Sequence, residues 1–474
     1  MSKTIQYVLA ILVGIALLAG ILAWLGPRLL GGNVGTRLAT RVSDAVGMQV
    51  SIGGPVTLRL FPRLHLMLEE VRIRNNGVDV AAVAEVELAV ALRALLHQNI
   101  EIEGIRFKRA KILIKRGQNG RFNVERTIAA PGALTVAAQV DRISFSDSSL
   151  VYKDAKLAND FSADGCNIEL KGLQMTPSAS ADLIAALSFA GELRCARMQA
   201  NDLTAANLKT TVAASRGVLK FAPVALEMFG GHGSGDLTAD LSTTEPVYHL
   251  HAVIEKLQIT DFSRTVKTAS VAKGAVDFSA DLTMRGTPKV PVMRTASGEA
   301  SLRGTDLLLE IGDLDRELSH YESTQNFNLV DLGAFFLAGP LGVAVTKGYD
   351  YARILKKAPG STSIRTLISR WHVEAGVAQA QDVALATPAN RIAMHGGLDF
   401  VNGTYEDVTI ALVDPQGCAR VQQKIHGSFG DPAIERPNVM STLAGPVRKL
   451  LEKGKSMLGA KCPVFYAGSV PPPQ

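Results

Sequence analysis

The stretch VTLRLFPRLHLMLEEVRIRN, residues 56–75, decides the fold class of this chain. Apolar and polar side chains alternate in it with a period of two on both sides of Pro62. Successive side chains of a β-strand point to opposite faces of the sheet, so this alternation predicts strands with one apolar and one charged face. Proline is typical of a turn or an edge position. The stretch therefore predicts antiparallel strands with one face in water.

The same period continues along the chain. Residues 86–90, 100–102 and 105–108 alternate likewise, and glycine-rich turns separate looser repeats of the pattern between residues 128 and 300. The commonest structure for such strands is a sandwich, in which a second sheet or helices cover the apolar faces. Few helical segments are available as covers here, so a curved antiparallel sheet with an apolar concave side is the alternative that we keep.

The apolar face of these strands is the candidate binding surface. Alternation assigns to it every second residue of the strands around Pro62 and of those before and after Gly104. The expected lining residues are Leu58, Leu60, Leu64, Leu66, Leu68, Ile100, Ile102, Ile105 and Phe107.

Composition excludes several classes of protein. The chain has 474 residues, of which 47% are apolar and 20% charged. These values are ordinary for a globular protein and exclude a disordered chain, a collagen-like fibre and a multi-spanning transporter. With 43 Gly and 20 Pro, the chain favours short strands and turns over a helical bundle.

Positive charge is concentrated between Arg106 and Arg126 within a chain of net charge +6. A basic face beside a bilayer attracts anionic head groups, which makes it a candidate membrane surface. A solvated outer face is the equally weighted alternative, and nucleic-acid binding is disfavoured because no aromatic residues are interleaved. The candidate membrane-surface residues are Arg106, Lys108, Arg109, Lys111, Lys115 and Arg116.

An apolar run from Ile5 to Gly26 precedes these strands. Its 22 residues correspond to about 33 Å of helix, which is enough to cross a bilayer. Tyr7 and Trp24 lie near its ends, where amphipathic rings prefer to sit. The run is too long for a cleaved signal peptide and lacks an A-x-A-like site, so we expect an uncleaved membrane anchor.

Four cysteines allow three pairings, and none belongs to a C-x-x-C motif. Pairing of cysteines that are neighbours in the sequence joins Cys166 to Cys195 and Cys418 to Cys462. These disulfides close loops of about 30 and 45 residues, and each stabilises the folded state by roughly 3–4 kcal/mol. Four free thiols are the alternative. Charges flanking the anchor do not fix its orientation, so the cysteines favour an oxidising compartment.

A helical character begins around residue 315 and lasts to residue 357. Residues 332–345 are uncharged but too short to span a membrane, and a basic run follows them. We expect a packed cap here, with membrane or partner contact as the alternative.

No pattern that carries catalysis, a metal or a cofactor is present. Gly454-Lys455-Ser456 resembles the end of a phosphate loop, but Lys449 occupies the position of its first glycine. His249 and His251 share one strand face without a third ligand nearby. We therefore expect a non-catalytic protein without cofactor or metal, with an unrecognised hydrolase as a minor alternative.

The order of these features resembles the AsmA family of Gram-negative envelope proteins. After the anchor come GMQVSIG at residues 47–53, the strands of residues 56–74, LL at 95–96 and the NGRFN turn at 119–123. The strand block 375–414, Gly417-Cys418 and CPVFYAGSV at 462–470 are similar to the carboxy-terminal region of the family. This resemblance divides the chain into an anchor (1–27), an N-terminal β domain (28–127), a central hairpin region (128–312), a helical segment (313–360) and a C-terminal β region (361–474).

The resemblance also implies a function and a location. Family members are inner-membrane proteins with their bulk in the periplasm, related to bridge-like lipid-transfer proteins that form a U-shaped β groove. We therefore expect a carrier or conduit for glycerophospholipid, directed from the inner towards the outer membrane. About 20–25 strands at about 4.8 Å give a groove of about 100–120 Å, so an envelope protein partner or a shuttling role belongs to this hypothesis. A periplasmic scaffold with a self-filled core is the alternative.

Overall fold

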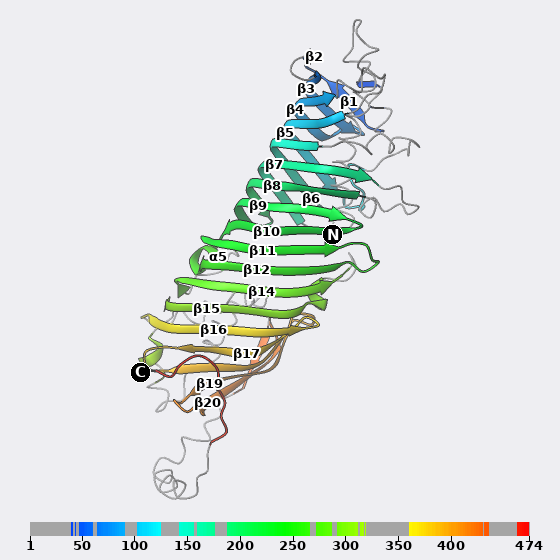
Figure 1. The fold of residues 1–474 in the computed structure, drawn as a ribbon. Helices are drawn as coiled ribbons and strands as arrows, with labels where there is room; N and C mark the ends of the chain where they lie inside the picture. The colour runs from blue at the N-terminus through cyan, green and yellow to red at the C-terminus, as the bar shows by residue number, and fades with distance from the viewer. Residues whose placement is uncertain are drawn as a thin grey trace, which may run out of the picture. The chain divides into compact units, whose positions relative to one another are not determined.

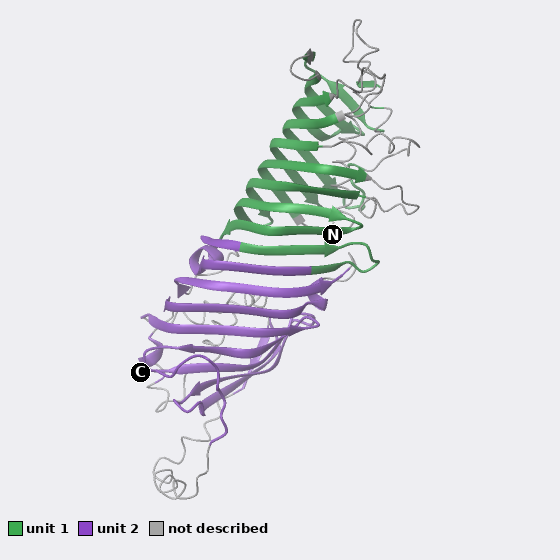
Figure 2. Cartoon of the chain, in the orientation of Figure 1, with its two compact units in different colours: residues 1–228, 234–248 green, residues 229–233, 249–474 purple. Residues whose placement is uncertain are grey.

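The computed structural model shows a mainly β chain (Figure 1). It describes residues 39–40, 43, 47–59, 64–90, 102–124, 142–155, 159–175, 187–265, 272–286, 292–310, 313–316, 318, 360–429, 431–435 and 462–473. The chain divides into two compact units (Figure 2): the first comprises Met1–Met228 and Ser234–Tyr248, and the second Phe229–Gly233 and His249–Gln474.

The first unit is built on a sheet in which strands that follow one another in the sequence pair side by side. All of its pairings are antiparallel except that of β5 with β6, which is parallel. Its strands are β1 (Gln49–Ile52), β2 (Val56–Arg59), β3 (Leu64–Asn75), β4 (Val78–Val90), β5 (Ile102–Arg116), β6 (Arg142–Asp154), β7 (Asn159–Met175), β8 (Leu187–Ala200), β9 (Leu203–Ser215) and β10 (Val218–Met228). Strands β11 (Gly231–Asp240) and β12 (Val247–Gln258) each contribute residues to both units.

Two-residue turns join several of these strands. Asn76-Gly77 joins β3 to β4 and Arg216-Gly217 joins β9 to β10, with a positive φ at all four residues. This is the backbone of the hairpin turn whose twist matches that of the flanking strands, and it is the reason why glycine follows Asn76 and Arg216. Local sequence therefore fixes which strands become neighbours.

The strands of the first unit bend near their midpoints (Figure 1). Regular pairing is interrupted there at side-by-side positions, several of which have the positive φ typical of a β-bulge. We call this row the bend line: Glu70, Ala84, Arg109, Asp147, Gly165, Ala196, Asn207 and Leu226. The expected curvature of the sheet is thus confirmed, and aligned bulges are its cause.

The second unit continues the pattern of antiparallel neighbours. Its remaining strands are β13 (Ala272–Lys273), β14 (Ala275–Arg285), β15 (Ser297–Leu309), β16 (Thr362–Glu374), β17 (Val377–Ala386), β18 (Arg391–Asp399), β19 (Thr404–Val413), β20 (Ala419–Ser428) and β21 (Asp431–Ile434). Strands β17 to β19 are buried on both faces over much of their length, which explains their nearly continuous apolar sequence.

Helices are few among the described residues. They comprise α5 (Ile259–Thr265), the 3₁₀ turn η3 (Val292–Thr295) and short pieces including residues 314–316. Leu314 and Leu318 are buried in the core of the second unit, and Asp315 accepts hydrogen bonds from Thr387 and Asn390 at 2.5 and 2.7 Å. The first residues of the expected helical segment therefore pack against the core of the second unit, and the expected cap itself stays a prediction because residues 319–359 lie outside the described part of the chain.

No helix in the described ranges is long and apolar enough to cross a membrane. The expected anchor, residues 5–26 with Tyr7 and Trp24, lies outside these ranges.

Both predicted disulfides are confirmed. Cys166 on β7 and Cys195 on β8 are directly opposite each other, with Cα atoms 4.0 Å apart. Cys418 pairs with Cys462 across 44 residues of sequence, with Cα atoms 6.1 Å apart. The second disulfide fastens the C-terminal strap, which we define as residues 462–470, to the β19–β20 connection.

The C-terminal strap covers the second face of β17 to β19. Tyr466 and Val470 pack with alanines of these strands, and the buried Arg391 guanidinium donates hydrogen bonds to the Val470 and Asp414 carbonyls at 3.1 and 2.6 Å. Asp382, only 4% exposed, accepts a hydrogen bond of 2.6 Å from the Tyr466 hydroxyl and others from Ser469. Burial opposes the ionisation of Asp382, but these hydrogen bonds outweigh it and hold the pKa below its ordinary value.

We expect the Cys166→Ala/Cys195→Ala variant to lose about 3–4 kcal/mol of unfolding free energy, because the disulfide closes a loop of about 30 residues. Urea denaturation measures this loss. Peptide mapping without reductant should find both crosslinks, and four alkylatable thiols in freshly isolated protein would contradict the pairing.

Asp382→Asn should destabilise the second unit by about 1.5–3 kcal/mol at pH 7, because the donors of the strap lose their charged acceptor on β17. A folded-state pKa below the unfolded value of about 3.9 stabilises the protein above that pH, and this contribution is lost as the pH falls through the folded pKa. The urea midpoints of wild type and Asp382→Asn should therefore converge below about pH 4. The exposed control Asp407→Asn should have the urea midpoint of wild type both at pH 7 and below about pH 4. A difference in midpoint between Asp382→Asn and wild type that does not change with pH would contradict the predicted effect of this pKa on stability.

Candidate functional site

Two parallel rows of apolar side chains cross the first unit from β2 to β10. The strand registers place each member directly opposite the next. The first row is Val56, Leu68, Val86, Phe107, Phe145, Ile168, Leu193, Thr210 and Val224. The second is Leu58, Leu66, Leu88, Ile105, Ile143, Leu170, Gly191, Val212 and Phe221.

The rows lie inside the bend of the sheet. Leu68 and Phe107, on one side of the bend line, belong to the same cluster as Val71 and Ile112 on the other side. Side chains from both halves of a bent strand can meet only on the inner face of the bend. Nine strands at about 4.8 Å spacing make each row about 38 Å long.

The predicted lining residues occupy the fully covered end of these rows. Leu66 is 8% exposed, Ile105 2%, and Leu68 and Phe107 0%. Leu60 and Ile100 lie outside the described residues, and for Leu58, Leu64 and Ile102 only the strand positions are described. The role of the nine as a lipid-binding surface stays a prediction.

Towards β7–β10 the same rows become partly open, although Leu170, Thr210 and Val212 stay buried. Ile168, Leu193, Phe221 and Val224 of the rows, and Phe189 beside them, are only half-buried, although they pack against the clusters of the covered end and of the Cys166–Cys195 disulfide. Sequence reasoning did not select these residues, because their strands alternate less cleanly than residues 56–75. Phe189 and Leu193 are four residues apart and Leu219 and Phe221 are two apart, so each pair lies on one face of its strand. This spacing could have indicated the apolar face.

The chemistry of this surface is that of an apolar wall. Thr210 is the one side chain of the two rows with a polar group, and it donates its hydroxyl to the Thr211 carbonyl at 2.9 Å. Within the described ranges no three His, Cys, Asp or Glu side chains are arranged to hold a metal ion. Such a wall can shield hydrocarbon from water but offers no acid, base or nucleophile of its own.

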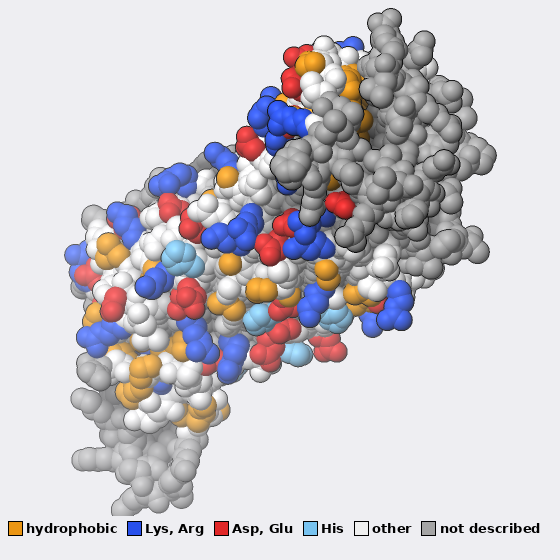
Figure 3. Space-filling view, turned by 45° about the horizontal axis from the view of Figure 1, so that its top comes forward, with side chains coloured by type: hydrophobic (Ala, Val, Ile, Leu, Met, Phe, Trp, Pro, Cys, Tyr) orange, Lys and Arg blue, Asp and Glu red, His pale blue; other side chains and the backbone are white. Residues whose placement is uncertain are grey.

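The predicted basic residues are in two different states, and Arg116 shares the inner-face parity of Ile112 and Ile114 rather than lying on the outer face of the bend. Arg106 contacts Glu87 at 3.1 Å, Lys108 contacts Glu85 at 2.6 Å, and Arg116 contacts the buried Asp154 at 3.2 Å. Arg109, Lys111 and Lys115 are exposed instead. Figure 3 shows charged side chains of both signs, with scattered apolar ones, on one face of the molecule.

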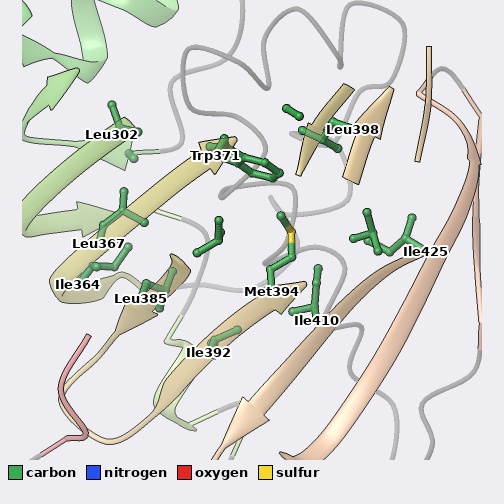
Figure 4. Close-up of a cluster of buried hydrophobic side chains, with 14 of the residues drawn as sticks. Leu302, Ile364, Leu367, Trp371, Leu385, Ile392, Met394, Leu398, Ile410 and Ile425 are labelled. Carbon is green, nitrogen blue, oxygen red and sulfur yellow. The ribbon is translucent and has the colours of Figure 1, made fainter. Parts of the chain in front are cut away.

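The second unit contains an apolar cluster of its own (Figure 4). Trp371 and Leu367 of β16 face Met394 of β18 and Ile410 of β19, and Trp371 donates its indole N–H to Ser369 at 2.7 Å. Partly buried Phe278, Leu282 and Met284 of β14 pack against the same cluster. Each unit therefore contains a buried apolar cluster of its own.

Comparison with known proteins identifies a family for this chain. A search of curated proteins and of solved structures found no significant match. The model of the family described as AsmA matches residues 1–180 and 185–336, which is more than half of the chain. This chain belongs to the AsmA family.

Proposed function

We propose that this protein carries or conducts glycerophospholipid from the inner towards the outer membrane of a Gram-negative bacterium, without catalysis. The observation that carries the proposal is the half-buried apolar surface of β7–β10, at the open end of two apolar rows. Family membership and the open β architecture are consistent with a role in envelope biogenesis or lipid transport.

The energetic need for such a surface is large. Two acyl chains with about 30 methylenes cost about 24 kcal/mol to expose to water at about 0.8 kcal/mol each. A barrier of that height allows about one event in a day. An apolar wall lowers the barrier by covering the chains, while the charged head group stays in water.

The open end is the better position for the chains. Leu68, Val86 and Phe107 are completely covered and have no surface to offer to a ligand. Phe189, Leu193 and Phe221 are half-buried, so part of their apolar surface is still accessible to a ligand. We therefore place the acyl chains along β7–β10.

The location of the protein is part of the proposal. Two disulfides favour an oxidising compartment, which for a Gram-negative protein is the periplasm. We propose a single-pass inner-membrane protein anchored by residues 5–26, with the following residues in the periplasm. An envelope protein partner would extend the path where one chain is too short.

A periplasmic scaffold is the second candidate function. The completely covered side chains of β3–β6 and the cluster around Trp371 favour it, because both are filled by the protein itself. The two functions differ in whether the half-buried end contacts lipid.

A photo-crosslinking residue at Leu193 or Phe221 should capture phospholipid in cells, because both side chains lie on the inner face. The same residue at Arg194 or Lys220, next along each strand and exposed on the other face, should not. Mass spectrometry of the purified adducts measures the difference. Equal yields at inner and outer positions, or none at all, would support the scaffold.

Phe221→Asp should abolish lipid capture at Leu193 while the protein stays folded, because a half-buried carboxylate can remain hydrated. Phe107→Asp should instead unfold the first unit, because burying a charge there costs several kcal/mol. Thermal unfolding and lipid capture are measured together, with Phe221→Leu and Phe107→Leu as matched controls. Unfolding of Phe221→Asp to the same degree as Phe107→Asp would show that the β10 end is also a closed core.

A further inference from the structure

The bend line divides the outer face of β3–β6 into two halves that differ in charge balance. On one side of it, Glu85 and Glu87 of β4 accept hydrogen bonds from Lys108 and Arg106 at 2.6 and 3.1 Å. Positive charge in this half is therefore neutralised within the sheet.

The other half carries positive charge that has no partner among the residues that the structure describes. Five exposed residues at or beyond the bend line form what we call the basic strip: Arg72, Arg109, Lys111, Lys115 and Lys153. Their side chains make no ion pair or hydrogen bond in the part of the chain that the structure describes. Their charge is therefore available to a ligand.

The register places these cations close together. Lys115 of β5 is directly opposite Lys153 of β6. Like charges in directly opposite positions destabilise a pair of strands. Arg72 and Lys111 flank Ala82, whose short side chain leaves the space between them open. An anion bound over the strip would relieve this repulsion.

Nearby carboxylates are mostly occupied elsewhere. Asp79 contacts Arg74 at 2.6 Å, and Asp154 is 1% exposed and contacts Arg116 at 3.2 Å. Asp160 is opposite Lys153 in register and reduces the charge of that end. With the exposed Glu70 and Asp147 of the bend line counted as well, the strip keeps a net charge of about two, which at about 1 kcal/mol per cation favours an anionic surface about 30-fold.

We infer that the basic strip rests on an anionic bilayer surface and binds the phosphate groups of its lipids. The small side chains of Ala82 and Ser149 lie on either side of Lys111 in register. Aromatic Phe107 and Phe145 point to the inner face, so the strip lacks the stacking platforms of nucleic-acid binders. This goes beyond the proposed lipid path, because it uses the opposite face of the sheet.

The test uses the full chain in nanodiscs of phosphatidylcholine alone or with a quarter of phosphatidylglycerol. A photo-crosslinking residue at Ser149 should capture phosphatidylglycerol at least tenfold more than phosphatidylcholine, and capture should fall as salt rises from about 0.05 to about 0.5 M. The triple variant Lys111→Glu/Lys115→Glu/Lys153→Glu should lower capture at least tenfold. The milder Lys→Gln triple should lower it by a smaller factor, with an unchanged melting temperature.

The matched control is Arg197→Glu/Lys209→Glu/Lys220→Glu, which changes the net charge equally at exposed positions of β8–β10. It should leave capture at Ser149 unchanged. Equal capture from both kinds of nanodisc, or equal loss in the two Glu triples, would overturn the inference. Capture of a duplex RNA without any lipid would overturn it in favour of nucleic acid.

Discussion

The structure depends on one constraint: side chains of a β-strand alternate between faces, and here one face is apolar. A flat sheet with this pattern would leave its apolar face in water. The bend line of the first unit resolves the problem by folding each strand, so that Leu68 and Val71 of one strand meet on the inside. The outer face is left for charged residues, which pair across strands as Glu85 and Lys108 do. Burial, curvature and surface charge thus have one origin.

The two units complete their cores in different ways. In the first, the inner face is covered at β3–β6 and becomes accessible towards β7–β10. In the second, the C-terminal strap adds a layer over β17–β19, so these strands are buried on both faces. Arg391 and Asp382 are buried charged groups that this arrangement requires, because they hold the strap by its carbonyls, Tyr466 and Ser469.

Much of the fold could be predicted from the sequence. The parts that could not be predicted have identifiable physical reasons. Alternation placed Leu66, Leu68, Ile105 and Phe107 on one face, and the separation of the cysteines suggested their pairing. Alternation cannot report how completely a face is covered, so it selected the closed end of the rows and missed Phe189 and Phe221. It also missed the parallel pairing of β5 with β6. Arg116 was expected at a membrane surface, but its partner Asp154 comes from β6, 38 residues away.

The tight turns of the sheet have a consequence for how it can be assembled. Asn76-Gly77 and Arg216-Gly217 each join two strands that pair with each other, so only two residues of chain separate such a strand from its partner. Contacts that are local in sequence form quickly and lose little chain entropy. The parallel β5–β6 step is different, since 25 residues separate the two strands before they can align. The first unit should therefore grow hairpin by hairpin in the order of synthesis, with a pause at that crossover.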